Sequence, residues 1–278
     1  MIKIITDSTC DMTAQRLKEL DIEMVPLTVH FGDNAYADKR DLDNKTFYQM
    51  LRQASSLPTT AQVNPADFEA VFRRHIENGH TVVGLFLSSQ LSGTVQSANI
   101  AAELMGSSDI HVIDSLTTTL GLNLMLEHAV MRRDAGVTAA ELAAELEALA
   151  SKVLIYAVVD TLKYLKMGGR LSAASAAIGG FLGISPVISL NGGLVEAVGK
   201  GRGKAAAYAK MGALYRAAEP DLTYPISVGH ADTPGETARV LEALTGVYDP
   251  KRVIENEIGS IIGTHVGPGA AGVAFIRK

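Results

Sequence analysis

The sequence predicts an α/β protein with two domains. Short apolar runs alternate with helix-like stretches along its 278 residues, a pattern typical of a largely parallel sheet with helices on its faces. The second half adds a different signal, because Asn191-Gly192 separates two β-like runs and favours a β-hairpin. We therefore expect an N-terminal α/β domain over residues 1–155, with a mostly parallel sheet, and a C-terminal α/β domain with a hairpin over residues 156–278.

Composition and charge exclude several classes of protein. Hydrophobic residues make up 47% of the chain and charged residues 20%, a balance that argues against disorder. The net charge of −5 gives no overall basic footprint for nucleic acid, and the single cysteine, Cys10, rules out a disulfide framework. Residues 171–195 carry no charge, but Pro186 and the turn at 191–193 interrupt them, and the start MIKIITDST is a strand rather than a signal peptide. We expect a cytoplasmic protein without a transmembrane segment.

The elements expected in the first half follow from the apolar pattern and from helix-start signals. Asp43 and Asn64 are placed to cap helices, and Pro65 suits a first helical position. The expected strands cover residues 2–6, 22–31, 81–87 and 110–114. The expected helices cover residues 13–20, 44–55, 65–78, 95–105, 120–134 and 139–151, the last two being amphipathic.

In the second half, Gly168-Gly169-Arg170 breaks a helix that starts at residue 161, and Ser172 can cap a small-residue helix over 173–182. The expected strands cover residues 154–159, 187–190, 194–198, 225–230, 252–258 and 272–276. Two further helices are expected over residues 204–218 and 234–244.

A hydroxyl-rich turn follows the apolar strand at 81–87. Its sequence, SSQLSGT, precedes a helix and contains Ser92, Gly93 and Thr94. Hydroxyls and backbone amides at a helix start favour an anion. Since no Asp, Glu, Lys or Arg lies between Glu77 and Glu103, this segment would meet an anion without a salt bridge. Alternatively, Ser92 or Thr94 simply caps the helix.

Four other segments are candidates for contact with a ligand. TDST at 6–9 contains Ser8, and VIDSLTTTL at 112–120 contains Ser115, but both segments suit ordinary capped turns equally well. PTTAQVNP at 58–65 is an ordinary loop unless its hydroxyls face a ligand. IIGTHVGPGAAG at 261–272 places Thr264 and His265 between a β-like run and a glycine-rich loop, although a lone histidine is usually structural or solvent-exposed.

Basic residues gather in one part of this acidic chain. Residues 161–210 contain seven lysines and arginines but one acid, Glu196. A solvated face is the ordinary interpretation of scattered lysines, whereas a local excess favours a phosphate-bearing or acidic partner. Arg170 and Arg202 are the better candidates for directional contacts, because a guanidinium can bind phosphate or carboxylate bidentately.

Seven segments in this order resemble the DegV family, the bacterial fatty-acid-binding proteins that serve as the lipid-carrying subunit of fatty acid kinase. The matching segments are TDSTCDM (6–12), PTTAQVNP (58–65), SSQLSGTVQSA (88–98), VIDSLTTTLGL (112–122), LKYLKMGGRLS (162–172), GKGRGKA (199–205) and IGTHVGPGAAG (262–272). Each is weak alone, but the ordered set covers nearly the whole chain and is specific.

The resemblance implies a buried acyl tunnel between two α/β domains. It implies that Thr60, Ser92 and His265 hold the fatty-acid carboxylate, and that Arg170 and Arg202 face the carboxyl end and the kinase or its product. The chain departs from the family pattern at Ala61, where a serine is usual, so one hydroxyl near the carboxylate is missing.

We therefore expect a fatty-acid-binding protein that presents the carboxylate to a separate ATP-dependent catalytic subunit and carries the acyl phosphate away. On this hypothesis it is not itself a complete enzyme and needs no cofactor or metal. The sequence has no GxxxxGK[ST] loop for ATP. Two alternatives stay open: a hydrolase or acyltransferase that uses Ser92 and His265, although a GxSxG elbow is missing, and a binder of another small anion without a kinase.

Overall fold

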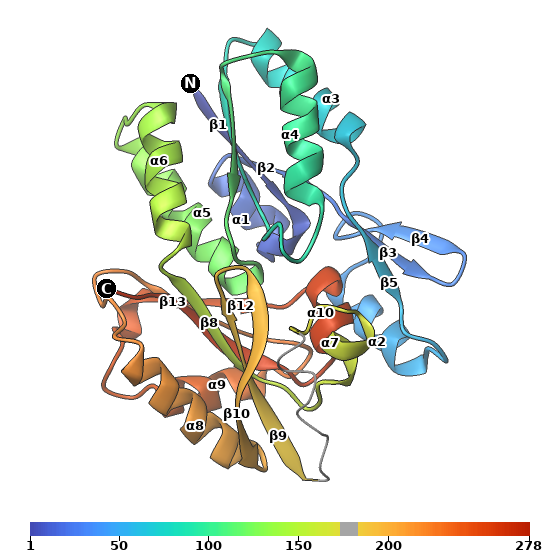
Figure 1. Ribbon diagram of the computed structural model, residues 1–278, viewed down its shortest axis with the longest axis vertical. Coiled ribbons are helices and arrows are strands. Elements are labelled where there is room, and N and C mark those ends of the chain that lie inside the picture. The colour runs from blue at the N-terminus through green and yellow to red at the C-terminus, as the bar shows by residue number, and fades with distance from the viewer. Residues whose placement is uncertain (173–182) are drawn as a thin grey trace.

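A four-stranded parallel sheet forms the centre of the N-terminal part, as the sequence predicts. The computed structural model describes residues 1–172 and 183–278, so the expected helix over 173–182 lies outside the described residues. The strand order is β2-β1-β6-β7 (Figure 1). The strands are β1 (Ile2–Asp7), β2 (Ile22–Val25), β6 (Thr81–Phe86) and β7 (Ile110–Asp114).

Helices cover both faces of this sheet, because successive strand residues point to opposite sides. Ile5 belongs to the same apolar cluster as Phe68 and Phe72, whereas Ile4 belongs to a second cluster with Leu142. The first face is covered by α3 (Pro65–Glu77) and α4 (Thr94–Met105). The second is covered by α1 (Ala14–Glu19), α5 (Thr119–Asp134) and α6 (Ala139–Ala150).

The prediction of a single strand over residues 22–31 is wrong, because Pro26 interrupts it. Proline has no N–H to donate to the strand ladder, and the chain leaves the parallel sheet there. The next strand, β3 (Thr28–Phe31), lies between β4 (Asn34–Ala37) and β5 (Thr59–Ala61) in a small antiparallel sheet. The segment 58–65 therefore contributes a strand rather than only a loop, and α2 (Asn44–Gln53) precedes it.

A six-stranded mixed sheet forms the C-terminal part, in the order β10-β9-β8-β13-β11-β12. The predicted hairpin is confirmed, because β9 and β10 pair antiparallel with Asn191 opposite Leu194. The strands are β8 (Val153–Val158), β9 (Ile184–Asn191), β10 (Leu194–Arg202), β11 (Ile226–His230), β12 (Val253–Glu257) and β13 (Ala271–Ile276). The expected division after residue 155 falls within β8 and stays a prediction.

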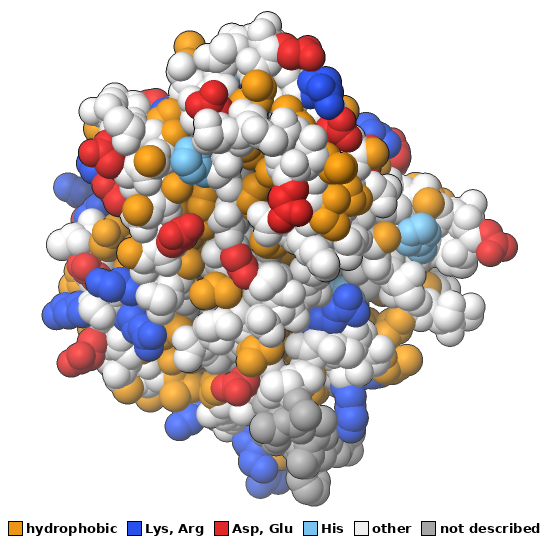
Figure 2. Space-filling view, turned by 45° about the horizontal axis from the view of Figure 1, so that its top comes forward, with side chains coloured by type: hydrophobic (Ala, Val, Ile, Leu, Met, Phe, Trp, Pro, Cys, Tyr) orange, Lys and Arg blue, Asp and Glu red, His pale blue; other side chains and the backbone are white. Residues whose placement is uncertain are grey.

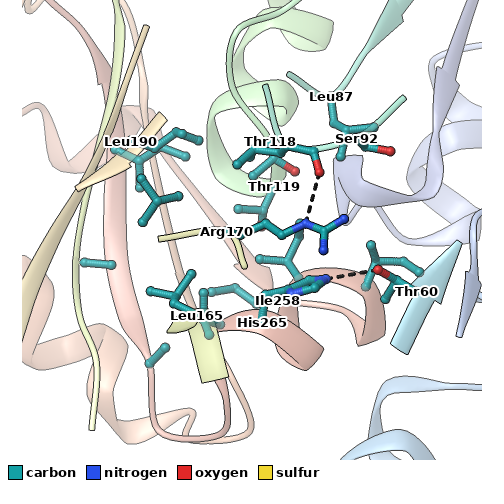
Figure 3. A pocket seen from close by; sticks show the side chains of 18 of the residues that line it. Thr60, Leu87, Ser92, Thr118, Thr119, Leu165, Arg170, Leu190, Ile258 and His265 are labelled. Carbon is teal, nitrogen blue, oxygen red and sulfur yellow. Dashed lines mark hydrogen bonds between the residues drawn. The ribbon is translucent and has the colours of Figure 1, made fainter. Parts of the chain in front are cut away.

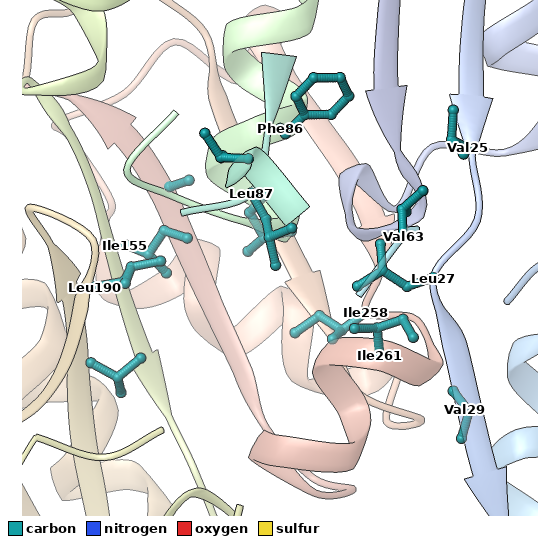
Figure 4. Packing of buried hydrophobic residues seen from close by; sticks show 14 of the residues in the cluster. Val25, Leu27, Val29, Val63, Phe86, Leu87, Ile155, Leu190, Ile258 and Ile261 are labelled. Carbon is teal, nitrogen blue, oxygen red and sulfur yellow. The ribbon is translucent and has the colours of Figure 1, made fainter. Parts of the chain in front are cut away.

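The two faces of this sheet have different partners. Helices α8 (Lys204–Ala217) and α9 (Gly235–Ala243) pack on the face that carries Leu154 and Val158. Ile155 and Leu190 point to the other face and join the apolar cluster that contains Leu27 and Ile258 (Figure 4). The N-terminal and C-terminal parts thus share one core, and α7 (Lys163–Met167) and α10 (Ser260–Val266) lie on this inner side (Figure 1).

Two helices differ from what the sequence suggested. The first two turns of α5 are buried on every side rather than amphipathic, because α5 packs against strands of both sheets. The run just before His265, which looked β-like in the sequence, is part of α10 (Ser260–Val266) instead. The β-branched Ile261 and Ile262 suggested a strand, but packing decides here: a side chain at Gly263 would collide with the ring of Phe47 and with Tyr48 on α2. In the described ranges, no helix is long and apolar enough to cross a membrane.

Candidate functional site

An apolar cavity of about 340 Å³ lies between the six-stranded sheet and the N-terminal part. Ile155, Ala157 and Leu190 line it from the six-stranded sheet, and Leu27 and Ile258 line it from the opposite side. Figure 3 shows a polar group at one side of the cavity and Leu165 and Leu190 at the other. The polar side chains that line it include those of Thr60, Gln62, Ser92, Arg170 and His265. The cavity therefore suits a molecule with a long apolar part and a polar end.

Thr60 and His265 meet at the polar end. The Thr60 Oγ1 lies 3.0 Å from His265 Nε2, although the two residues are 205 positions apart in the chain. Strand β5 positions Thr60 through its pairing with Val29 of β3, and α10 carries His265 beside β5. The packing that turns residues 260–266 into a helix therefore also creates this contact.

His265 is a neutral imidazole at pH 7. Burial, and then the positive charge of Arg170, lower its pKa from 6.5 to about 4. Its Nδ1 is buried, has no hydrogen-bond partner among the described residues and faces Gly168. A Cβ at Gly168 would collide with Nδ1, so this glycine permits the close approach of α7 and α10.

Ser92 lies beside the cavity at the start of α4. Its Oγ is 2.9 Å from Thr94 Oγ1 and accepts a hydrogen bond of 3.3 Å from the Thr94 amide. Gly93 also lines the cavity, and a Cβ there would collide with the amide of Gln62. A helix N-terminus carries a partial positive charge, so this corner favours an anion without a formal charge of its own.

Arg170 is the one formally charged residue among the described residues that line the cavity. Its Nε donates to the carbonyl of Leu91 at 3.2 Å, and its Nη1 donates to the carbonyl of Gly168 at 2.6 Å. These contacts hold the guanidinium beside the polar end, while the residue stays exposed to solvent. Arg170 can therefore attract an anion without closing a buried ion pair on it.

Five of the candidate site residues predicted from the sequence do not line the cavity. Ser8 accepts from the amide of Leu27 at 3.1 Å, Ser115 donates to the carbonyl of Thr117 at 3.2 Å, and Thr264 donates to the carbonyl of Ser260 at 2.8 Å. Thr94 is fully buried against Ser92, and Arg202 is exposed at the end of β10. The first three hydroxyls thus hold the turns and the helix that form the walls.

Several lining residues were not singled out from the sequence. Gln62 and Thr119 lie within segments that had been selected, but nothing in those segments distinguished them from their neighbours. Ile155 and Ala157 could have been found from strand alternation, since they share the face opposite Leu154 and Val158.

The described residues contain no group of three or more His, Cys, Asp or Glu side chains placed to hold a metal ion. The donors at the polar end are hydroxyls, a neutral imidazole and a guanidinium, a set that suits an organic anion better than a cation.

The DegV family model, described as uncharacterised protein, DegV family, matches residues 1–278. The chain belongs to the DegV family. Among its relatives, a DegV domain-containing protein of Deinococcus radiodurans is 34% identical, with 99% of this chain and 98% of that protein covered. Protein DegV of Bacillus subtilis is 30% identical over 100% of this chain and 99% of its own.

Solved structures share the fold over their full lengths. A DegV family protein from Thermus thermophilus, described as binding fatty acid, matches with a TM-score of 0.90 and 32% identity, covering 100% of this chain and 99% of that one. A stearic-acid-binding protein from Eubacterium ventriosum matches with a TM-score of 0.85 and 29% identity, again over 100% and 99% of the two chains. The two-domain α/β fold expected from the sequence is therefore confirmed.

We expect His265 to titrate near pH 4 in the ligand-free protein. Because the folded pKa lies below the unfolded value of 6.5, the folded state binds fewer protons between these pH values. The stabilisation from the neutral ring is therefore complete above about pH 6.5 and falls as the pH drops through that window, by on the order of 1–3 kcal/mol.

Side-chain ¹⁵N NMR of His265 measures the titration directly, and urea unfolding of wild type and His265→Gln at several pH values measures the stability difference. Burial raises the pKa of Asp7 and of Asp38 to about 6, so their contribution to stability changes with pH in the opposite direction. Because both proteins contain these two residues, that contribution cancels in the comparison. A ring that titrates near 6.5 would contradict the assigned environment.

Proposed function

We propose that this protein binds a long-chain fatty acid in the cavity between its six-stranded sheet and its N-terminal part. The carboxylate lies at Thr60, Ser92 and His265, and the acyl chain extends toward Ile155 and Leu190. One observation carries the proposal: segments from three distant parts of the chain place neutral hydrogen-bonding groups at one side of an otherwise apolar cavity. The fatty-acid binding described for the Thermus thermophilus and Eubacterium ventriosum proteins supports it.

The acyl chain supplies most of the affinity. Burying about fifteen methylenes at roughly 0.8 kcal/mol each contributes on the order of 12 kcal/mol before the costs of ordering the ligand and protein are subtracted. The polar end can then select for a carboxylate and orient it rather than contribute the bulk of the binding free energy.

The polar end binds the carboxylate by exchanging one hydrogen bond for several. In the free protein Thr60 and His265 bond to each other at 3.0 Å. A bound carboxylate accepts from the Thr60 hydroxyl, from the Ser92 hydroxyl and from His265 in its Nε2–H tautomer. Because these donors are neutral at pH 7, the carboxylate keeps its charge and its nucleophilic character. Ala61 offers no hydroxyl there, so the clamp has one donor fewer than the usual pattern.

We further propose that a separate ATP-dependent kinase phosphorylates the bound carboxylate. A carboxylate oxygen attacks the γ-phosphorus of ATP, the bond to the β,γ-bridging oxygen breaks, and acyl phosphate and ADP form.

Figure 2 shows several Lys and Arg side chains at the lower end of the molecule, over the C-terminal part. Arg202 is exposed and, with Arg170 at the cavity, suits contact with the kinase or the new phosphate. Lys204 serves the fold instead, since its Nζ contacts Asp160 at 3.0 Å and the Gly269 carbonyl at 3.1 Å.

The geometry gives less support to a Ser–His hydrolase. His265 Nε2 is bonded to Thr60, whereas the hydroxyl of Ser92 is bonded to Thr94. A catalytic base also needs a group that orients it, and His265 Nδ1 has no such partner among the described residues. A pKa of about 4 makes this imidazole a weak base at neutral pH. A small anion alone would leave the apolar part of the cavity unused.

Protein purified from a bacterial host should carry bound fatty acid that native mass spectrometry detects. After delipidation, we expect Thr60→Val and Ser92→Ala each to weaken palmitate binding about tenfold, because each removes a hydrogen bond to a charged group. Isothermal titration calorimetry measures the change. Ser89→Ala is the matched control, since this exposed serine lies in the same turn but does not line the cavity. Wild-type protein that neither carries nor binds fatty acid would refute the proposal.

Arg202→Ala should keep palmitate affinity within about twofold, because Arg202 does not line the cavity. With a bacterial fatty acid kinase catalytic subunit and ATP, the same variant should lower acyl phosphate formation at least tenfold. Trapping acyl phosphate with hydroxylamine measures the product. Lys251→Ala removes an exposed base elsewhere and serves as the control. Product formation equal to wild type would show that Arg202 does not contribute to kinase contact.

A further inference from the structure

The segment TDSTCDM at residues 6–12 begins with the last two residues of β1 and continues past its end, yet none of its residues is among those that line the cavity. Asp11 is 5% exposed, so its carboxylate is held by protein groups rather than by water. A buried carboxylate needs such partners to offset the loss of hydration. The partners of Asp11 come from elements that are far apart in the sequence.

Three elements donate to the Asp11 carboxylate. Thr119 Oγ1 donates to Oδ2 at 2.6 Å, the amide of Gly259 donates to Oδ1 at 3.0 Å, and Lys39 Nζ lies 3.1 Å from Oδ1. Thr119 begins α5 and lines the cavity, whereas Gly259 immediately precedes α10. Asp11 therefore joins the starts of two helices that form opposite parts of the site.

The backbone around this carboxylate is locally strained. Asp11, Lys39 and Thr119 all have positive φ, at 54°, 63° and 41°, which residues with a Cβ rarely adopt. Such strain persists only where the surrounding contacts determine the conformation, and it is concentrated at functional sites. All three strained residues meet at one carboxylate, so these contacts serve to fix a particular arrangement.

The start of α10 and the residues just before it form further hydrogen bonds with the N-terminal part. The hydroxyl of Tyr48 donates to the carbonyl of Ile258 at 2.8 Å, and Ser260 Oγ donates to Asp38 Oδ1 at 2.6 Å. A Cβ at Gly259 would collide with Asp11 Oδ1, so the carboxylate approaches the backbone closely there. Together these contacts determine where α10 begins, and α10 carries His265 to Thr60.

We infer that Asp11 is a positioning residue for the carboxylate clamp, acting through Gly259 and α10 on His265. The inference rests on the proposed function for the identity of the ligand. In Asp11→Asn, Lys39 loses the carboxylate that it pairs with, and one of the two oxygens that accept from Thr119 and from the Gly259 amide is replaced by an NH₂ donor. Helix α10 can then shift, and the hydrogen-bond donors at Thr60 and His265 no longer converge on one carboxylate.

The test compares myristic acid with 1-tetradecanol, which have equal chain lengths and differ at the polar end. Wild type should bind the acid at least tenfold more tightly than the alcohol, because the acid forms charge-assisted hydrogen bonds. Asp11→Asn should reduce this ratio at least threefold. Ser260→Ala is a smaller change that removes the hydrogen bond between α10 and Asp38. It should also reduce the acid-to-alcohol affinity ratio, and it replaces Asp11→Asn as the test variant if Asp11→Asn does not fold. Fluorescence displacement measures both affinities.

Thr138→Ala is the control for lost stability alone. Thr138 caps α6 with a capping box and does not line the cavity, so its loss should lower the melting temperature while leaving the acid-to-alcohol ratio within twofold. An unchanged ratio in both Asp11→Asn and Ser260→Ala would overturn the inference. If wild type binds neither ligand, the proposed function fails. The placement of His265 by α10 can still be tested by NMR of the ligand-free variants. The His265 ring resonances should move in Ser260→Ala and stay in place in Thr138→Ala.

Discussion

The contact between Thr60 and His265 is the interaction on which the site depends. It joins a short strand of the N-terminal part to a helix near the end of the chain, at an oxygen–nitrogen distance of 3.0 Å. Its geometry requires that β5 pair with β3, that α10 pack on α2 and that both sheets share one apolar core. The cavity is therefore a product of how the two parts meet, and neither part alone contains it.

The apolar length and the polar end of the cavity differ in their chemistry. On the proposed function, its apolar length provides the free energy for retaining an acyl chain, and its polar end provides selectivity. Under the kinase proposal the carboxylate must stay reactive, and the neutral groups at that end suit this, since a tight buried ion pair would stabilise its charge and weaken it as a nucleophile. Arg170 lines the cavity but stays partly in solvent, held by the carbonyls of Leu91 and Gly168. In the proposed phosphorylation, that arrangement lets Arg170 contact the new phosphate without forming a buried ion pair with the acid.

Local patterns in the sequence predicted the parallel sheet, the hairpin and the motif order that identifies the DegV family. They failed where tertiary contacts decide: the run before His265 contains adjacent isoleucines and looked β-like, but close packing at Gly263 places it in the helix α10. Thr60, Ser92 and His265 were expected together from the resemblance, whereas hydroxyl content alone also selected Ser8, Ser115 and Thr264, which bond to backbone in the walls. A sequence does not show which way a hydroxyl points, and the role of Asp11 depends on three partners that only the fold brings together.

The most direct test of the central claim is ¹³C NMR of palmitate labelled at its carboxyl carbon and bound to the delipidated protein. We expect one bound carboxyl resonance, distinct from free palmitate, with the shift of an ionised carboxylate at pH 7. That resonance should move in His265→Gln and in Thr60→Val but not in Ser89→Ala. A bound resonance that is protonated at pH 7, or one that is indifferent to both His265 and Thr60, would contradict a neutral clamp that holds an ionised carboxylate.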